Sequence, residues 1–250
     1  MALRATISAV ASNPHVGAGP ALIKSLDSLE HAHNYRRWIL ELAEKAICGR
    51  VLEVGAGSGT FTADVAPTAE VVAVEPDQVF LPLLYAVAEH AGNVRVIAGT
   101  LDDVDVDERF DGALMINVLE HIEDDAAAVR QVYELLRPGA HLFVWVPAFQ
   151  LLMSDFDRSI GHHRRYRLQP LRTLLADTGF EVLDARYVNM PGWFSWLLVA
   201  RCLRHHPTGG ALVNAFDRRI VPLVRAVERH VRVPFGQSVM IVARRPDEPQ

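Results

Sequence analysis

The chain of 250 residues has only two cysteines, and they are too far apart in the sequence to form a metal-binding or redox motif. A disulfide framework is therefore excluded as the source of its stability. No apolar stretch reaches the roughly 20 residues that a membrane-spanning helix needs, and the first residues lack the pattern of a secretory signal peptide. These absences predict a reduced, soluble protein of the cytoplasm.

Lysine is also scarce, and the charges are unevenly distributed. Residues 1–150 carry 10 Lys and Arg against 21 Asp and Glu, whereas residues 151–250 carry 15 Arg, no Lys and 9 Asp and Glu. Guanidinium groups bind anions in a bidentate manner, so this asymmetry indicates either an anionic partner or simply solvated helix surfaces that happen to be rich in arginine.

Half of the residues are hydrophobic, which excludes a disordered chain and allows one domain with a full core. Patterns typical of strands and helices alternate along the sequence, and this predicts an α/β fold with a doubly wound, mostly parallel sheet. The expected strands are residues 51–54, 70–74, 94–97, 112–116, 141–146, 180–188 and 238–243. The expected helices are residues 22–47, 60–65, 78–90, 124–136 and 171–178, with Pro138 and Gly139 ending the fourth of these.

The chain divides into four segments within one structural domain. We expect an N-terminal arm and helical cap at residues 1–47, a ligand-binding core at 48–188, a helical insertion at 189–235, and a last strand with a tail at 236–250. A structureless connection as long as 189–235 would be unusual in a compact domain. The insertion is a candidate lid, dimer contact or membrane-facing element, and the chain is expected to be a monomer or a homodimer.

One glycine-rich segment carries most of the chemical information. Glu53 lies in a predicted strand, and Gly55, Gly57 and Gly59 follow that strand and precede a predicted helix. Glycines allow a tight turn and a close approach of the backbone to a ligand. Glu75 ends the next predicted strand, where a carboxylate can accept hydrogen bonds from both hydroxyls of a ribose. The pattern predicts an adenosine-containing ligand across the carboxyl ends of these two strands.

The E-x-G-x-G-x-G spacing resembles motif I of class I S-adenosylmethionine-dependent methyltransferases. Thr60 stands where the dinucleotide-binding fingerprint has its third glycine. Further segments resemble the same family, closest to its small-molecule methyltransferases of the type 11/12 group; they are residues 71–77, 99–102, 110–122 and 136–146. The resemblance implies a Rossmann-like sheet of seven strands with the last one antiparallel, and S-adenosylmethionine as cofactor.

The resemblance also implies how this cofactor is bound. Glu75 would hold the ribose diol, Leu101 would meet the adenine edge, and Asn117 would offer its carbonyl to the methionine ammonium. Tyr35 or Arg36 would pair with the methionine carboxylate, with a packing role as the alternative for Tyr35. The implied cofactor residues are Tyr35, Arg36, Glu53, Gly55, Ala56, Gly57, Gly59, Glu75, Pro76, Thr100, Leu101, Asp102, Asn117 and Val118. Thr100 lies where the family often has aspartate, and Asp102 is the alternative partner of the adenine amino group.

Residues 155–167 concentrate polar side chains after the fifth strand, at the edge where open α/β sheets bind ligands. The candidate catalytic residues are His162, Tyr166 and His121; for the last, a satisfied surface histidine is the alternative. The candidate acceptor-binding residues are Asp157, Arg164, Arg165, Trp193 and Trp196. The alternatives are structural pairing of the arginines with aspartates, and an ordinary core or interface role for the tryptophans.

The leading prediction is methyl transfer to a small-molecule acceptor, foremost O-methylation. N- or C-methylation of a small molecule or lipid-linked glycan is the alternative. A nucleic-acid or protein methyltransferase and a non-catalytic cofactor-binding protein are the other classes, and the former is disfavoured because residues 116–121 lack an N/D-P-P-Y motif. We expect that the protein does not bind nucleic acid. We expect no bound metal either, because no metal-ligand spacing stands out. A peripheral membrane contact is expected only through the insertion.

Overall fold

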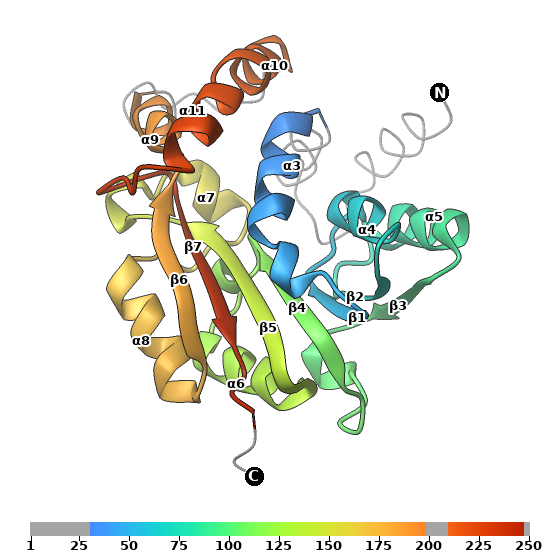
Figure 1. Ribbon diagram of the computed structural model, residues 1–250. Coiled ribbons are helices and arrows are strands. Elements are labelled where there is room, and N and C mark those ends of the chain that lie inside the picture. The colour runs from blue at the N-terminus through green and yellow to red at the C-terminus, as the bar shows by residue number, and fades with distance from the viewer. Residues whose placement is uncertain (1–30, 199–209, 248–250) are drawn as a thin grey trace.

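The computed structural model describes residues 31–198 and 210–247, which form a single seven-stranded sheet with helices on both faces (Figure 1). The strand order is β3-β2-β1-β4-β5-β7-β6, and β7 is antiparallel to both of its neighbours while the other pairs are parallel. The strands are β1 Arg50–Val54, β2 Glu70–Glu75, β3 Val94–Ala98, β4 Phe110–Ile116, β5 Leu136–Pro147, β6 Glu181–Val188 and β7 Ser238–Arg244. The predicted fold class is confirmed.

Each face of the sheet is covered by its own set of helices, because buried strand residues alternate between two hydrophobic clusters. One face packs against α3, α4, α5 and α11, and the other against α6 and α8. The α-helices are α3 His33–Leu42, α4 Thr60–Val65, α5 Leu81–Ala91, α6 Asp125–Leu135, α7 Asp155–Ser159, α8 Leu168–Thr178, α9 Met190–Trp196, α10 Gly210–Arg219 and α11 Val221–Glu228. The short 3₁₀ helices are η1 Glu44–Ala46, η2 Leu101–Asp103, η3 Leu119–His121 and η4 Gln150–Leu152.

The segment between β6 and β7 contains α9, α10 and α11 in its described part, where the sequence analysis expects a helical insertion. Residues 199–209 of that segment, which include Cys202, lie outside the described residues. So do residues 1–30, which contain most of the expected N-terminal arm, and residues 248–250 of the tail. Of the helix expected at 22–47, the described part forms α3 followed by η1.

The prediction for Pro138 and Gly139 was wrong in one respect. The preceding helix, α6, ends at Leu135, and both residues lie inside the long strand β5. Gly139 has a φ of +79° and donates its N–H to the carbonyl oxygen of Arg245 at 2.8 Å. The first part of β5 is irregular, because its pairing with β4 changes register there. Gly139 adopts the left-handed backbone conformation in this irregular part of the strand.

The strand order predicts a ligand-binding crevice at one edge of the sheet. The chain goes from β1 to β2 on one side and returns to β4 on the other side of β1. At such a switch point the connections leave the carboxyl ends of the strands in opposite directions, and this leaves room for a ligand. The glycine-rich turn after β1, the end of β2 and the residues after β4 therefore meet at this edge.

Gly112 in β4 provides a test of how tightly the N-terminal segment packs on the sheet. A Cβ added there would lie 2.0 Å from the carbonyl oxygen of Ala46 in η1. Because a backbone atom cannot move aside cheaply, we expect Gly112→Ala to lower the free energy of unfolding by about 1–3 kcal/mol in urea titrations. The control is Gly92→Asn, since Gly92 has a φ of +76° and no neighbour within 4 Å of an added Cβ. Asparagine tolerates this conformation, so an equal loss in both variants would contradict the packing argument.

Candidate functional site

The turn between β1 and α4 is built from glycines with left-handed backbone. Gly55, Gly57 and Gly59 have φ values of +69°, +56° and +83°. A Cβ on Gly55 would lie 2.3 Å from Cγ2 of Val118, so the turn also packs directly against the segment after β4. The N–H of Gly55 donates to the carbonyl oxygen of Val74 at 2.8 Å, which fixes the turn to β2. Glycine is thus required here both by backbone conformation and by space.

Glu75 closes the other side of this turn from the last position of β2. Its carboxylate accepts hydrogen bonds from the N–H of Gly57 at 2.7 Å and from the N–H of Asp77 at 2.8 Å. The side chain is buried, and burial raises the pKa of Glu75 although both N–H donors oppose this effect. The carboxylate therefore connects the ends of the two strands, and the adjacent Pro76 is exposed.

Glu53 lies beneath the turn, and its carboxylate is engaged inside the protein. It accepts a hydrogen bond from Oγ1 of Thr62 in α4 at 2.6 Å. Burial raises the pKa of Glu53 to about 7; the hydrogen bond from Thr62 opposes this rise, and the nearby charge of Glu75 adds to it. The hydrogen bond between Glu53 and Thr62 therefore connects β1 to α4. Ala56, in the turn above, is also buried.

The segment expected to meet the adenine edge forms η2. Leu101 is buried, and Asp102 accepts a hydrogen bond from Nε2 of Gln131 at 3.2 Å. The segment is shaped by Asp103, which the sequence analysis missed: its carboxylate accepts the N–H of Thr100 at 2.8 Å. The T-x-x-D spacing of a capping box was the signal that could have identified it.

Asn117, directly after β4, has a φ of +52°, which is unusual for a residue other than glycine. Its N–H donates to the carbonyl oxygen of Trp145 in β5 at 2.8 Å. Such backbone outliers concentrate at functional sites. Val118, the next residue, packs against Gly55, so the segment that begins at Asn117 lies against the glycine turn.

Tyr35 and Arg36 on α3 make mainly structural contacts. The ring of Tyr35 packs edge-on against Trp145, with ring centres 5.8 Å apart, and burial raises the pKa of its hydroxyl to about 12. Arg36 pairs with Asp64 of α4 at 2.9 Å. A cavity of about 750 Å³ lies beside this pair between α4 and α5, and its lining includes neither Glu75 nor Asn117. Its lining does include Arg36 and, from the glycine turn, Ser58 and Gly59, so this hollow borders the turn on the side of α4 and α5.

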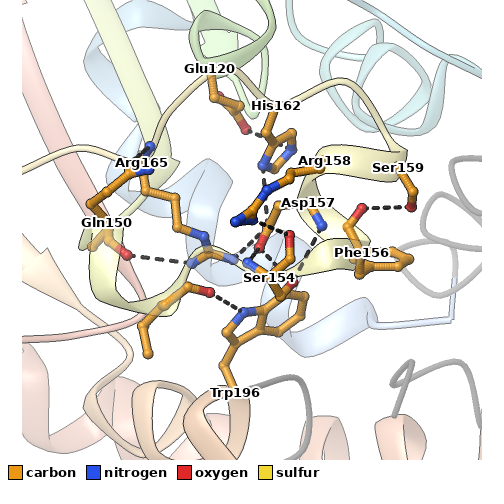
Figure 2. Close-up of polar contacts among 12 residues, drawn as sticks. Glu120, Gln150, Ser154, Phe156, Asp157, Arg158, Ser159, His162, Arg165 and Trp196 are labelled. Atoms are coloured by element: carbon orange, nitrogen blue, oxygen red, sulfur yellow. Dashed lines mark hydrogen bonds and ion pairs between the residues drawn. The ribbon is translucent and has the colours of Figure 1, made fainter. Parts of the chain in front are cut away.

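Asp157 organises the residues after β5 (Figure 2). Its carboxylate accepts hydrogen bonds from the N–H and the hydroxyl of Ser154, pairs with Arg165 at 2.7 Å, and lies 3.2 Å from Nδ1 of His162. Burial favours a higher pKa, but His162 and Arg165 outweigh it and hold the pKa of Asp157 well below its usual range. Asp157 therefore fixes the orientation of His162.

The two arginines of the G-H-H-R-R-Y run are engaged with protein groups. Arg165 lies over the ring of Trp196, 5.0 Å from its centre, in addition to its pair with Asp157. Arg164 pairs with Asp125 at 2.7 Å. This is the structural pairing that the sequence analysis gave as the alternative to binding an anionic acceptor.

Tyr166 connects the same run to η3 and α6. Its hydroxyl lies 3.1 Å from the carbonyl oxygen of Leu119 and 2.9 Å from the carboxylate of Asp125. Burial, together with the charge of Asp125, raises the pKa of this phenol beyond its usual range. A phenol held in this way is unsuited to act as a base, so these contacts favour a positioning role for Tyr166 over that of a base.

Glu120 and His121 in η3 lie next to His162. The rings of His121 and His162 meet edge-to-face at 4.6 Å, and burial lowers the pKa of His121 to about 4. Glu120 is fully buried, and in the described part of the chain neither carboxylate oxygen accepts a hydrogen bond from another residue. Burial raises the pKa of Glu120 to about 8. The sequence analysis missed Glu120, although its place beside His121 was a signal.

The two predicted acceptor-side tryptophans lie in α9 and contact different neighbours. Trp196 donates its indole N–H to the carbonyl oxygen of Leu152 at 3.1 Å, whereas Trp193 packs edge-on against Phe194 and Phe235. Several large apolar side chains are exposed in the insertion, namely Phe194, Leu198, Ile220, Leu223, Val227 and Val231. No described helix is long and apolar enough to cross a membrane.

Comparisons with known proteins identify a methyltransferase domain in the chain. Residues 28–185 match the model of a methyltransferase domain. An O-methyltransferase of Aspergillus sclerotiorum is 30% identical over 146 residues, which are 54% of this chain and 55% of that protein. An uncharacterized protein of Mycobacterium tuberculosis is 33% identical over 211 residues, covering 78% of this chain and 67% of that protein. The chain thus spans about half the length of the Aspergillus protein.

The N-methyltransferase NodS from Bradyrhizobium japonicum, in complex with S-adenosyl-L-homocysteine, shares the fold. The TM-score is 0.59 at 14% identity, and 98% of each chain is covered. At this identity the similarity concerns the fold alone.

The buried position of Glu53 predicts a pH-dependent stability. The ordinary pKa of glutamate is 4.5 and that of folded Glu53 is about 7, so the unfolded chain releases this proton at lower pH than the folded one. Stability from this group is complete below pH 4.5 and is lost as the pH rises towards 7. Relative to Glu53→Gln, the wild type should lose about 3 kcal/mol of unfolding free energy between pH 4 and pH 8. The exposed Glu89, changed to Gln, is the control, and a constant difference for Glu53→Gln would contradict this placement.

The positioning role of Tyr166 predicts a loss of stability in Tyr166→Phe. This change removes a buried donor from Asp125 and Leu119, which should lower the free energy of unfolding by about 1–2 kcal/mol. Tyr85, which is 50% exposed on α5, supplies the control variant Tyr85→Phe. If both variants unfold like the wild type in urea, the hydroxyl of Tyr166 does not hold the loop.

Proposed function

Since the chain belongs to the class I S-adenosylmethionine-dependent methyltransferases, we propose that it transfers the methyl group of this cofactor to an oxygen atom of a small-molecule acceptor. The meeting of Gly57 and Glu75 at the ends of β1 and β2 is the observation that supports the proposal most directly. It combines a turn that a ligand can approach closely with a buried carboxylate at the place where a ribose is expected.

The carboxylate of Glu75 has capacity left for the sugar. A carboxylate offers about four acceptor positions, and the N–H groups of Gly57 and Asp77 occupy two of them. In our proposal the two ribose hydroxyls take the others, and the adenine lies against Leu101. The two N–H donors keep the carboxylate aligned before the cofactor arrives, so binding does not have to order it.

The methionine end of the cofactor lies in this proposal between the glycine turn and Asn117. The sulfonium and the ammonium are both cationic, and Glu53 lies directly beneath the turn. A cation placed above it would lower the pKa of Glu53 and favour its ionised form. Glu53 therefore supports the cofactor through charge, without a direct contact.

The acceptor lies in this proposal between Asn117 and the wall formed by His121 and His162. Methyl transfer is an in-line displacement: the oxygen–carbon bond forms while the carbon–sulfur bond breaks, and S-adenosylhomocysteine leaves. The acceptor oxygen must come within about 3–3.5 Å of the methyl carbon, and a hydroxyl must lose its proton. The similarity to an O-methyltransferase supports oxygen as the acceptor atom. Because Arg164 pairs with Asp125 and Arg165 pairs with Asp157, neither arginine is left to bind an anionic acceptor in this proposal. The proposal therefore does not require an anionic group on the acceptor.

The role of Glu75 is tested by calorimetric titration with S-adenosylhomocysteine. We expect Glu75→Ala to weaken binding by about 10–100-fold, because the ribose would lose hydrogen bonds to a charged acceptor. Glu70→Ala is the matched control: Glu70 begins the same strand, is exposed, and pairs with Arg50 at 3.1 Å. The proposal fails if the wild type does not bind this ligand, or if both variants bind it equally well.

A further inference from the structure

Glu120, His121 and His162 bring three potential metal ligands together beside the proposed acceptor position. One ligand atom from each residue lies within 4.8 Å of the other two. We propose that this cluster binds one divalent transition-metal ion. The proposal departs from the sequence analysis, which expects no metal because no metal-ligand spacing stands out in the sequence.

The distance between the ligand atoms suits two ligands of one ion. Nε2 of His162 lies 3.8 Å from Oε1 of Glu120, which is too long for a hydrogen bond. Two ligands at about 2.1 Å from a tetrahedral ion lie about 3.4 Å apart. The two side chains therefore need only a small inward movement to share an ion.

The state of Glu120 supports the same interpretation. A fully buried carboxylate normally has hydrogen-bond donors or a paired cation around it. Within the described residues, both oxygens of Glu120 lack such a donor, and both are shielded from solvent. An ion held between Glu120 and the two histidines would supply the missing partner.

The histidines are oriented as metal ligands commonly are. The second ring nitrogen of a ligating histidine usually donates to a carboxylate or to a backbone carbonyl. Nδ1 of His162 lies 3.2 Å from Asp157, which leaves Nε2 free to face Glu120 (Figure 2). The ring of His121 lies beside Gly161, since a Cβ added to that glycine would lie 3.5 Å from Nδ1 of His121. Both imidazoles thus have neighbours outside the cluster.

The ligand set selects the class of ion. Two imidazoles and one carboxylate suit zinc, iron, cobalt or manganese, whereas magnesium and calcium prefer oxygen ligands. Three protein ligands leave a coordination position open for another molecule. If the proposed function holds, the acceptor hydroxyl would take that position, and the ion would lower its pKa and favour loss of the proton.

Cobalt(II) is a suitable probe because its visible spectrum reports on its ligands. The full-length protein, freed of metal with a chelator, would be titrated with Co²⁺ alone. We expect one ion per chain with absorption bands of a nitrogen- and oxygen-ligated site, and competition by Zn²⁺ but not by Mg²⁺. His121→Ala and His162→Ala should each weaken Co²⁺ binding at least about tenfold. His163→Ala is the matched control, since His163 is adjacent to His162 but exposed, and it should bind like the wild type.

Glu120→Gln separates metal binding from folding. The amide has nearly the same shape and carries no buried charge, so the thermal unfolding temperature should not fall while Co²⁺ binding is lost. The proposal is overturned if the wild type shows no stoichiometric binding, or if binding survives both histidine substitutions.

Titration of the same samples with S-adenosylhomocysteine distinguishes this proposal from the proposed function. Retained binding of that ligand without Co²⁺ binding overturns the metal site alone. Retained Co²⁺ binding without binding of S-adenosylhomocysteine overturns the cofactor assignment and leaves the metal site supported.

Discussion

The hydrogen bond from the N–H of Gly57 to the carboxylate of Glu75 connects the two strands on which the crevice depends. Parallel neighbours end at the same edge of a sheet, but their last residues are otherwise free to diverge. Here a turn with left-handed glycines brings an N–H group back over the end of β2. Because Glu53 holds the same turn to α4 from below, the backbone that would receive the cofactor is fixed from two directions.

The fold could be predicted because its signals are local. Each parallel strand is a short apolar run followed by a turn, and the glycines at 55, 57 and 59 mark the first crossover without reference to other parts of the chain. Pro138 and Gly139 show where this fails. Their composition indicates a helix end, but Gly139 pairs with the backbone at Arg245, and a partner so distant in sequence leaves no local sign.

The composition of the site was easier to predict than the role of each residue. Asp157, Arg165 and Tyr166 stand out in the sequence because polar groups are dense around them. Their roles depend on partners that only the fold supplies, such as Asp125 for Tyr166. Glu120 was overlooked for the same reason: its place beside His121 was a signal, but its complete burial is seen only in the fold.

Some arginines of residues 151–250 form ion pairs with acidic residues of the first 150 residues. Arg164 pairs with Asp125, and Arg225 in α11 pairs with Glu41 in α3, so the arginine-rich part binds the acidic part. Exposed pairs of this kind contribute little stability, but partly buried ones such as Arg164 hold one segment against another. The loop after β5 is thereby held against η3, together with the hydrogen bond from the N–H of His163 to the carbonyl oxygen of Glu120 at 2.9 Å. Part of the arginine excess seen in the sequence therefore serves to pair segments within the chain.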